Sequence, residues 1–162
     1  MTDGKMEAVS SFAKDEYGIS AATVEAMINY GYVLLAIAGA DQEVSEKEME
    51  WLINHQTKFG APENVIELYK SFDYKNADIK ELLPNIKVDV ATWSVPPNLI
   101  YHAIHMSSAD GMYAEAERAK VRQTAKILGV ADDIVLTLES LVDMERAVVR
   151  MRKALFHIDT LS

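Results

Sequence analysis

The sequence contains no cysteine and little proline or glycine. The absence of cysteine excludes disulfide frameworks, thiolate zinc sites and cysteine nucleophiles, and it fits a reducing compartment. Four prolines and seven glycines occur among 162 residues, and most of them fall between segments of helical periodicity. No segment has a clear strand pattern. These features predict an all-α fold.

Long apolar runs and a leader segment are also missing. The longest apolar run, residues 30–40, is about half the ~20 residues that a membrane-spanning helix needs. Residues 1–5 do not begin a basic segment followed by an apolar stretch, so they do not resemble a signal peptide. We therefore predict a cytoplasmic protein without a membrane span, although peripheral association with a membrane remains open.

Positive charge is scarce. Lys and Arg number 16 against 25 Asp and Glu, which gives a net charge of −9. This charge repels phosphate backbones and argues against a nucleic-acid partner, whereas cations or basic proteins suit it. The length, with 49% hydrophobic and 25% charged residues, is typical of a single folded domain over residues 1–162.

Periodicity and capping signals divide the chain into helices. They are predicted over residues 3–16, 21–39, 45–60, 62–72, 78–83, 96–108 and 114–128, and in a long terminal helix from Asp132. The second of these is apolar nearly all round in its later half, so we expect it to be central. Residues 84–97 are the least regular part, and an exposed Trp93 there would indicate docking.

The terminal helix carries a broad apolar face. Its side chains repeat every seven residues in two adjacent rows: Ile134, Leu141, Val148 and Leu155, then Val135, Val142, Val149 and Phe156. Such a face permits a homodimer without requiring one. A basic cluster near the end of the helix complements the helix dipole, and we interpret it as a solvated face: Arg146, Arg150, Arg152 and Lys153.

The chain contains an internal repeat. Residues 40–48 align with residues 109–117 at a constant offset of 69, and the same offset relates Gly60 to Gly129. Upstream, Tyr32, Leu35 and Ile37 align with Tyr101, Ile104 and Met106. Each copy is predicted to form a helix–turn–helix hairpin, and we expect the two hairpins to pack about a pseudo-twofold axis.

Residues 109–117 form an acidic turn of the pattern Ala-Asp-Gly-x-[Val/Ile/Tyr]-x-x-x-Glu, and residues 40–48 match it at every position but the glycine. In both copies the helix that follows ends in Phe-Gly or Leu-Gly. This repeated signature resembles the tellurite-resistance TerB-like proteins over about residues 21–130. The resemblance implies an all-helical domain whose acidic residues bind metal ions in stress-response assemblies often found near membranes. The matching residues are Asp41, Glu48, Asp110 and Glu117. One departure is Gln42, which replaces the glycine present as Gly111; a left-handed glutamine would cost about 1 kcal/mol and distort the first turn.

The acidic turns have two interpretations. Each places an aspartate and a glutamate near one helix N-terminus, where their oxygens could hold Ca²⁺, Mg²⁺ or Mn²⁺. If the copies meet, Asp41, Glu48, Asp110 and Glu117 form one four-carboxylate cluster. Alternatively, the aspartates make local turn hydrogen bonds and Glu48 only completes a capping box with Ser45. Ala114 cannot cap in this way, which favours a ligand role for Glu117. Neither turn has the ligand pattern of an EF-hand.

Two histidines offer a second, less favoured metal site. His102 and His105 lie three residues apart and share a helix face, which is compatible with zinc binding together with His55 or Asp110. The alternative is that they are packed, polar side chains. The sequence has no phosphate-binding glycine loop, His-Glu-x-x-His motif or nucleophile elbow, so we assign no catalytic residue and expect no organic cofactor.

The sequence therefore predicts a non-enzymatic, TerB-like module that binds cations through duplicated acidic turns. Metal ions and one or more proteins are its expected partners, in a tellurite- or metal-resistance or stress-response system. The first alternative is a protein–protein interaction module whose acidic turns are only helix caps. A distant alternative is a metal-dependent hydrolase that uses the histidine pair.

Overall fold

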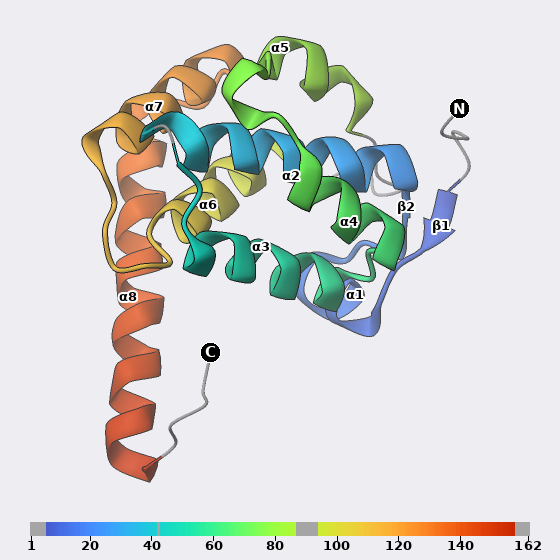
Figure 1. Cartoon of the computed structure of the whole chain (residues 1–162). Helices are drawn as coiled ribbons and strands as arrows, with labels where there is room; N and C mark the ends of the chain where they lie inside the picture. Colours follow the sequence, from blue (N-terminus) through green and yellow to red (C-terminus); the bar gives the residue numbers. More distant parts are fainter. Residues whose placement is uncertain (1–5, 42, 87–93, 158–162) are drawn as a thin grey trace.

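The computed structural model describes residues 6–41, 43–86 and 94–157. It confirms the all-α fold, with α2 running through the body and α8 projecting from one side (Figure 1). The helices are α1 (Ser11–Tyr17), α2 (Val24–Ala38), α3 (Glu46–Phe59), α4 (Glu63–Ser71), α5 (Ile79–Leu82), α6 (Val95–Ser107), α7 (Glu115–Leu128) and α8 (Asp132–Phe156). Three short 3-10 turns join them: η1 (Gly39–Asp41), η2 (Tyr74–Asn76) and η3 (Leu83–Asn85).

Helix α2 forms the centre of the core, as its all-round apolar character predicts. Between residues 26 and 38 every side chain except Tyr32 is buried. Gly31 allows α4 to cross closely, because a Cβ at this position would lie 2.2 Å from a ring carbon of Tyr69. The Tyr69 hydroxyl donates to the backbone oxygen of Met27 at 2.5 Å, so the ring is held by polar as well as apolar contacts.

The N-terminal segment differs from the prediction. Strand β1 (Met6–Ala8) pairs antiparallel with β2 (Ala21–Thr23). The sequence predicted no strand here, because these residues were assigned to the starts of the helices over 3–16 and 21–39. Helix α1 starts only at Ser11, because the Ser10 hydroxyl accepts a hydrogen bond from the Ala13 amide and fixes the cap there. Thr23 caps α2, and its hydroxyl accepts a hydrogen bond from the Ala26 amide. Strands of three residues are too short to show an alternating pattern.

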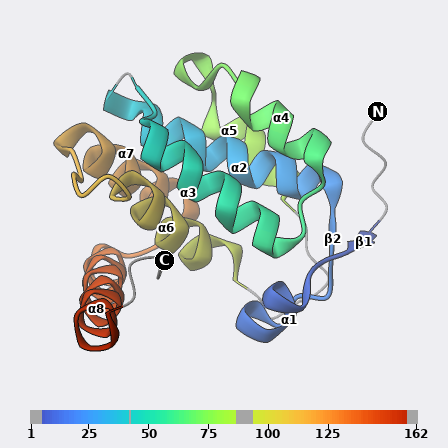
Figure 2. The same ribbon diagram turned by 60° about the horizontal axis from the view of Figure 1, so that its bottom comes forward.

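The repeat is confirmed as two helical hairpins, α2–α3 and α6–α7. Helices α3 and α7 begin and end at positions 69 residues apart, and each is followed by a left-handed glycine, Gly60 at φ +113° and Gly129 at φ +75°. Helix α6 packs against both α2 and α3, and η1 of the first hairpin packs against α7 of the second. Figure 2 shows the two hairpins side by side in the body. The turn of the first hairpin therefore lies close to the second copy.

Helix α8 is the predicted long terminal helix, but only the first part of one of its apolar rows is buried, and Phe156 at the end of that row is 64% exposed. Val135 and Val142 are buried against the body, whereas the neighbouring row is exposed. Arg146, expected in solvent, instead donates to the backbone oxygens of Ser108 and His105. The expectations for Gln42 and Trp93 concern positions outside the described residues. Among the helices of the described part, none combines the length and the apolar character needed to cross a membrane.

Candidate functional site

The two turn aspartates make the same local hydrogen bond. Asp41 Oδ1 accepts from the Glu43 amide at 3.2 Å, and Asp110 Oδ1 accepts from the Met112 amide at 2.9 Å. Gly111 takes φ +85°, and a Cβ added there would meet nothing within 4 Å, so its backbone conformation and not crowding favours glycine. Each aspartate thus commits one carboxylate oxygen to its own turn.

The two glutamates cap the helices that follow these turns. Glu48 Oε2 accepts from the Ser45 amide at 3.0 Å while the Glu48 amide donates to Ser45 Oγ at 3.2 Å, which confirms the capping box. Glu117 Oε1 accepts from the Ala114 amide at 3.1 Å, but alanine has no oxygen to complete the box. Both side chains are buried, with 2% exposure for Glu48 and 1% for Glu117. Simple helix capping does not require such burial.

Electrostatics link the two copies. Burial, with smaller contributions from Glu117, Asp110 and Asp41, raises the pKa of Glu48 from 4.5 to about 8. Burial, with contributions from Asp41 and Asp110, raises the pKa of Glu117 from 4.5 to about 7, although the backbone hydrogen bonds oppose both increases. Carboxylates from both turns therefore act on one another, as the repeat predicts. Near neutral pH this cluster retains protons that an exposed carboxylate would release.

Two buried oxygens in the cluster lack hydrogen bonds. Glu117 Oε2 and Ser107 Oγ are both buried and have no hydrogen-bond partner among the described residues. The Ser107 hydroxyl is close enough to lower the pKa of Glu117, yet the two groups do not meet hydrogen-bonding geometry. Among the residues that the structure describes, no three His, Asp or Glu side chains converge closely enough to hold a metal ion. The cluster can hold a proton as it stands, and a cation only after its side chains move inward.

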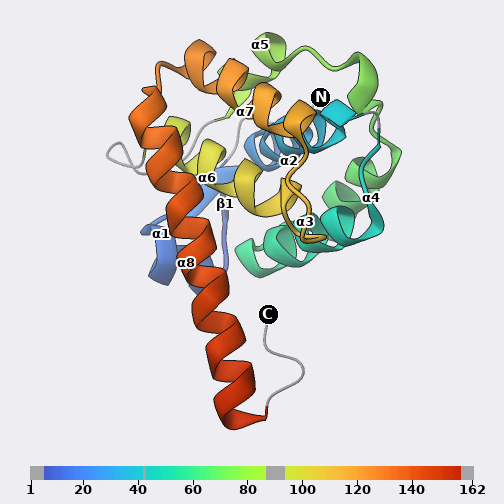
Figure 3. The same ribbon diagram turned by 90° about the vertical axis from the view of Figure 1, so that its left-hand side faces the viewer.

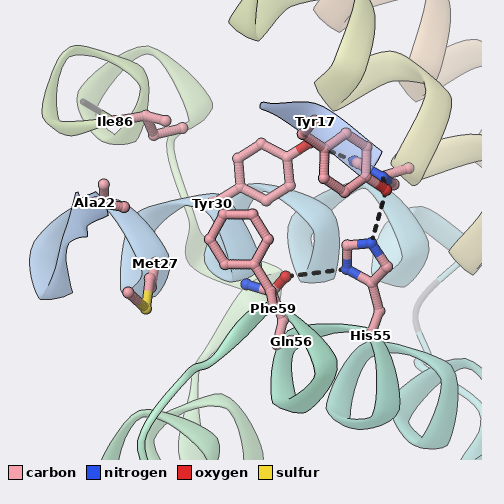
Figure 4. Close-up of a pocket in the computed structure, with 10 residues that line it drawn as sticks. Tyr17, Ala22, Met27, Tyr30, His55, Gln56, Phe59 and Ile86 are labelled. Atoms are coloured by element: carbon pink, nitrogen blue, oxygen red, sulfur yellow. Dashed lines mark hydrogen bonds between the residues drawn. The ribbon is translucent and has the colours of Figure 1, made fainter. Parts of the chain in front are cut away.

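His55 and His102 lie in a separate cluster between α1, α2, α3 and α6. His102 Nε2 lies 2.8 Å from the Tyr17 hydroxyl, and His102 Nδ1 lies 2.5 Å from the Tyr30 hydroxyl. His55 Nε2 lies 3.3 Å from the same Tyr17 hydroxyl, and its Nδ1 lies 3.1 Å from Gln56 Oε1 (Figure 4). All four ring nitrogens are therefore engaged by protein groups.

His105 lies next to this pair, because Trp51 stacks on both His55 and His105, but it makes different polar contacts. Its Nε2 lies 2.9 Å from Glu145 Oε2 on α8, and its ring stacks on Trp51. Burial lowers the pKa of His55 to about 4 and that of His102 well below 6.5, so both rings are neutral at pH 7. His102 and His105 thus have different partners despite their shared helix face.

Sequence reasoning missed the tyrosines that bond His102. A histidine on the buried side of an apolar helix needs polar partners, but the pairing of Tyr17 and Tyr30 with it depends on how α1 and α2 pack. Beside these rings is a cavity of about 30 Å³ with an almost wholly apolar lining that includes Met27 and Phe59 (Figure 4). The cavity is too small for an organic ligand, which needs about 300 Å³ or more.

Comparison with known proteins agrees with this arrangement. The family model described as tellurite resistance protein TerB matches residues 27–138, which is more than half of the chain. The chain belongs to the TerB family. The TerB match includes both acidic turns and the first part of α8.

A solved structure extends the comparison over nearly the whole chain. It is the crystal structure of a tellurite resistance protein from Nostoc punctiforme PCC 73102, with a TM-score of 0.77 and 28% sequence identity. The match covers 94% of this chain and 94% of that one. No curated protein matches the chain. The TerB fold here thus includes the N-terminal segment and α8 as well as the repeated hairpins.

Proposed function

We propose that this TerB protein binds a divalent cation between its two acidic turns, as a non-enzymatic component of a tellurite- or metal-resistance or broader stress-response system. The ligands are Asp41, Glu48, Asp110 and Glu117. The observation that supports this proposal most is the buried Glu117 Oε2, which has no hydrogen-bond partner among the described residues and lies among other carboxylates. A buried carboxylate oxygen without a partner is costly, and a bound cation would remove that cost.

The ligand chemistry suits a hard cation. All four side chains offer oxygen, which Ca²⁺, Mg²⁺ and Mn²⁺ prefer, whereas Zn²⁺ favours sites that include imidazole or thiolate. Each capping or turn hydrogen bond uses one oxygen of its carboxylate, so the second oxygen can face a cation. Because the side chains must first move together, we expect a dissociation constant on the order of 10⁻⁵–10⁻³ M, in the weaker part of the range for calcium sites.

Calorimetry on metal-stripped protein tests this proposal. Ca²⁺, Mg²⁺ and Mn²⁺ are titrated into the unmodified protein and into Asp110→Asn and Glu117→Gln. Matched controls are Glu46→Gln and Glu115→Gln, because these exposed glutamates begin α3 and α7 at equivalent repeat positions. We expect binding heat in the unmodified protein and controls and its loss in both site variants. Heat that survives both site variants, or no heat at millimolar cation, would leave the acidic turns as helix caps.

The interaction-module alternative has a specific observation in its favour. All four carboxylates already accept a backbone hydrogen bond near a helix start, which is the role that capping alone would give them. It predicts that the site variants change stability without changing cation binding. The hydrolase alternative has less support, because both ring nitrogens of His102 already lie within hydrogen-bonding distance of tyrosine hydroxyls.

A further inference from the structure

Helix α8 leaves a regular row of large apolar side chains exposed. The exposed fractions are 43% for Ile134, 37% for Leu141, 61% for Met144, 54% for Val148, 62% for Met151 and 65% for Leu155. From Leu141 onward these residues are spaced alternately three and four apart, which is the spacing of the a and d positions of a coiled coil. We call these six side chains the α8 seam.

The seam continues along a part of α8 that the body does not support. Val135 and Val142, in the first part of the helix, are its buried residues, whereas Val148, Met151 and Leu155 each expose more than half of their surface. Figures 1 and 3 show this end of α8 projecting away from the other helices. A projecting helical segment shorter than about 12 residues is marginal in water without a packed partner.

The charges of α8 are sorted along its length. All acidic side chains precede all basic ones: Asp132, Asp133, Glu139, Asp143 and Glu145, then Arg146, Arg150, Arg152 and Lys153. The helix dipole favours acids in the first turn and bases in the last, but it does not account for Asp143 and Arg150, which lie further in. Both of these side chains are exposed. Glu139, Glu145 and Arg146 bond to groups of the body, so the exposed Asp143 and Arg150 are the charges left for a partner.

We propose that two copies of this chain form an antiparallel dimer along the α8 seam. An antiparallel pair places the acidic half of each α8 against the basic half of the other. A parallel pair would place acidic half against acidic half and basic half against basic half, and these like charges would repel. The charge boundary lies between Glu145 and Arg146, so the two-fold axis crosses α8 close to this boundary. The seam then meets itself, as a two-fold interface requires.

The charge pattern favours a second copy of α8, and not a membrane, as the partner of the α8 seam. An amphipathic helix that lies on anionic lipid carries basic residues along its polar face. The first half of α8 instead exposes Asp132, Asp133 and Asp143. A second α8 supplies both charge signs in the required order, so the chain is complementary to itself.

Light scattering after size-exclusion chromatography, from low to several hundred micromolar protein, tests the dimer. We expect a dimer mass for the unmodified chain and a monomer mass for the double variant Val148→Glu/Met151→Glu. Leu136→Glu is the matched control, because Leu136 is 57% exposed on α8 but lies off the seam, and it should remain dimeric. Circular dichroism and thermal melting verify that each variant is folded.

The absence of cysteine allows an independent test of orientation. Ala147→Cys lies near the axis and should form a disulfide-linked dimer on mild oxidation. Ser140→Cys mixed with Ala154→Cys should cross-link, whereas neither should cross-link with itself. These three positions flank the seam and are exposed.

Three results would overturn the proposal. One is a monomer mass at several hundred micromolar. The second is a dimer that Val148→Glu/Met151→Glu leaves intact. The third is cross-linking of Ser140→Cys with itself and of Ala154→Cys with itself, which would show a parallel pair. A monomeric chain that binds phosphatidylserine vesicles, and loses this binding in the seam variant, would assign the seam to a membrane.

Discussion

The buried glutamates make the stability of this protein depend on pH. Glu48 and Glu117 have pKa values of about 8 and about 7 in the folded chain, above the ordinary 4.5. Between the ordinary and the folded values, the folded state binds protons that the unfolded state has released. The free energy of unfolding therefore falls as pH rises, and the loss is complete above the folded pKa values.

The histidines act in the opposite direction at lower pH. His55 titrates near pH 4 in the folded chain and the pKa of His102 also lies well below 6.5, so the unfolded state binds protons that these rings do not. They raise the free energy of unfolding as pH increases to about 6.5, and contribute no further slope above it. The window from about pH 6.5 to about pH 9 consequently reports on the glutamates.

The size of the effect follows from the pKa values. Over this window the folded chain loses about one proton from Glu48 and part of one from Glu117, which corresponds to at most about 3 kcal/mol at about 1.4 kcal/mol per pKa unit. Solvent at the rim of the turns screens part of this interaction, so we expect the free energy of unfolding to fall by about 2 kcal/mol.

Urea unfolding in metal-free buffer at several pH values across this window measures the decrease. In Glu48→Gln/Glu117→Gln the amides stay neutral, so the free energy of unfolding should change by less than about 0.5 kcal/mol over the window. Glu46→Gln/Glu115→Gln, with exposed side chains, should keep the full decrease. A flat profile in the unmodified protein, or an equal decrease in the buried-site variant, would refute the reasoning.

Further expectations concern packing and hydrogen bonds. Gly31→Ala places a Cβ 2.2 Å from a ring carbon of Tyr69, and urea unfolding should show a loss of about 2–3 kcal/mol. Gly111→Ala meets nothing within 4 Å but keeps φ +85°, so about 1 kcal/mol should be lost; equal losses at the two glycines would contradict this. Tyr30→Phe removes the 2.5 Å partner of His102 Nδ1 and should lower the free energy of unfolding by about 1–3 kcal/mol; unchanged stability would mean that this hydrogen bond contributes little.

Local signals in the sequence located the repeated hairpins well. The capping box at Ser45 and the glycines after α3 and α7 act within a few residues of one another, so their positions alone predict helix ends. The common offset then predicts that the turns are equivalent. The N-terminal ribbon was missed because β1 and β2 are stabilised by pairing across α1, which no local pattern reports.

The sequence located the four acidic residues in their turns and helix starts but did not predict how deeply the two glutamates are buried. Spacing alone brings Asp41 and Glu48 to one helix start, yet the burial of Glu48 and Glu117 results from packing η1 against α7. The same reason applies to His102, whose tyrosine partners come from α1 and α2. Long-range packing decides which polar side chains become buried, and it therefore decides their pKa values as well.

The most direct test of cation binding at the acidic turns is the number of protons released per cation bound. Binding heats measured in two buffers with different ionisation enthalpies give this number. Because Glu48 and Glu117 hold protons near pH 7, binding of Ca²⁺ or Mn²⁺ should release on the order of one proton at pH 7 and almost none at pH 9. Cation binding at pH 7 without proton release, or with the same release in Glu48→Gln/Glu117→Gln, would contradict a site formed by these carboxylates.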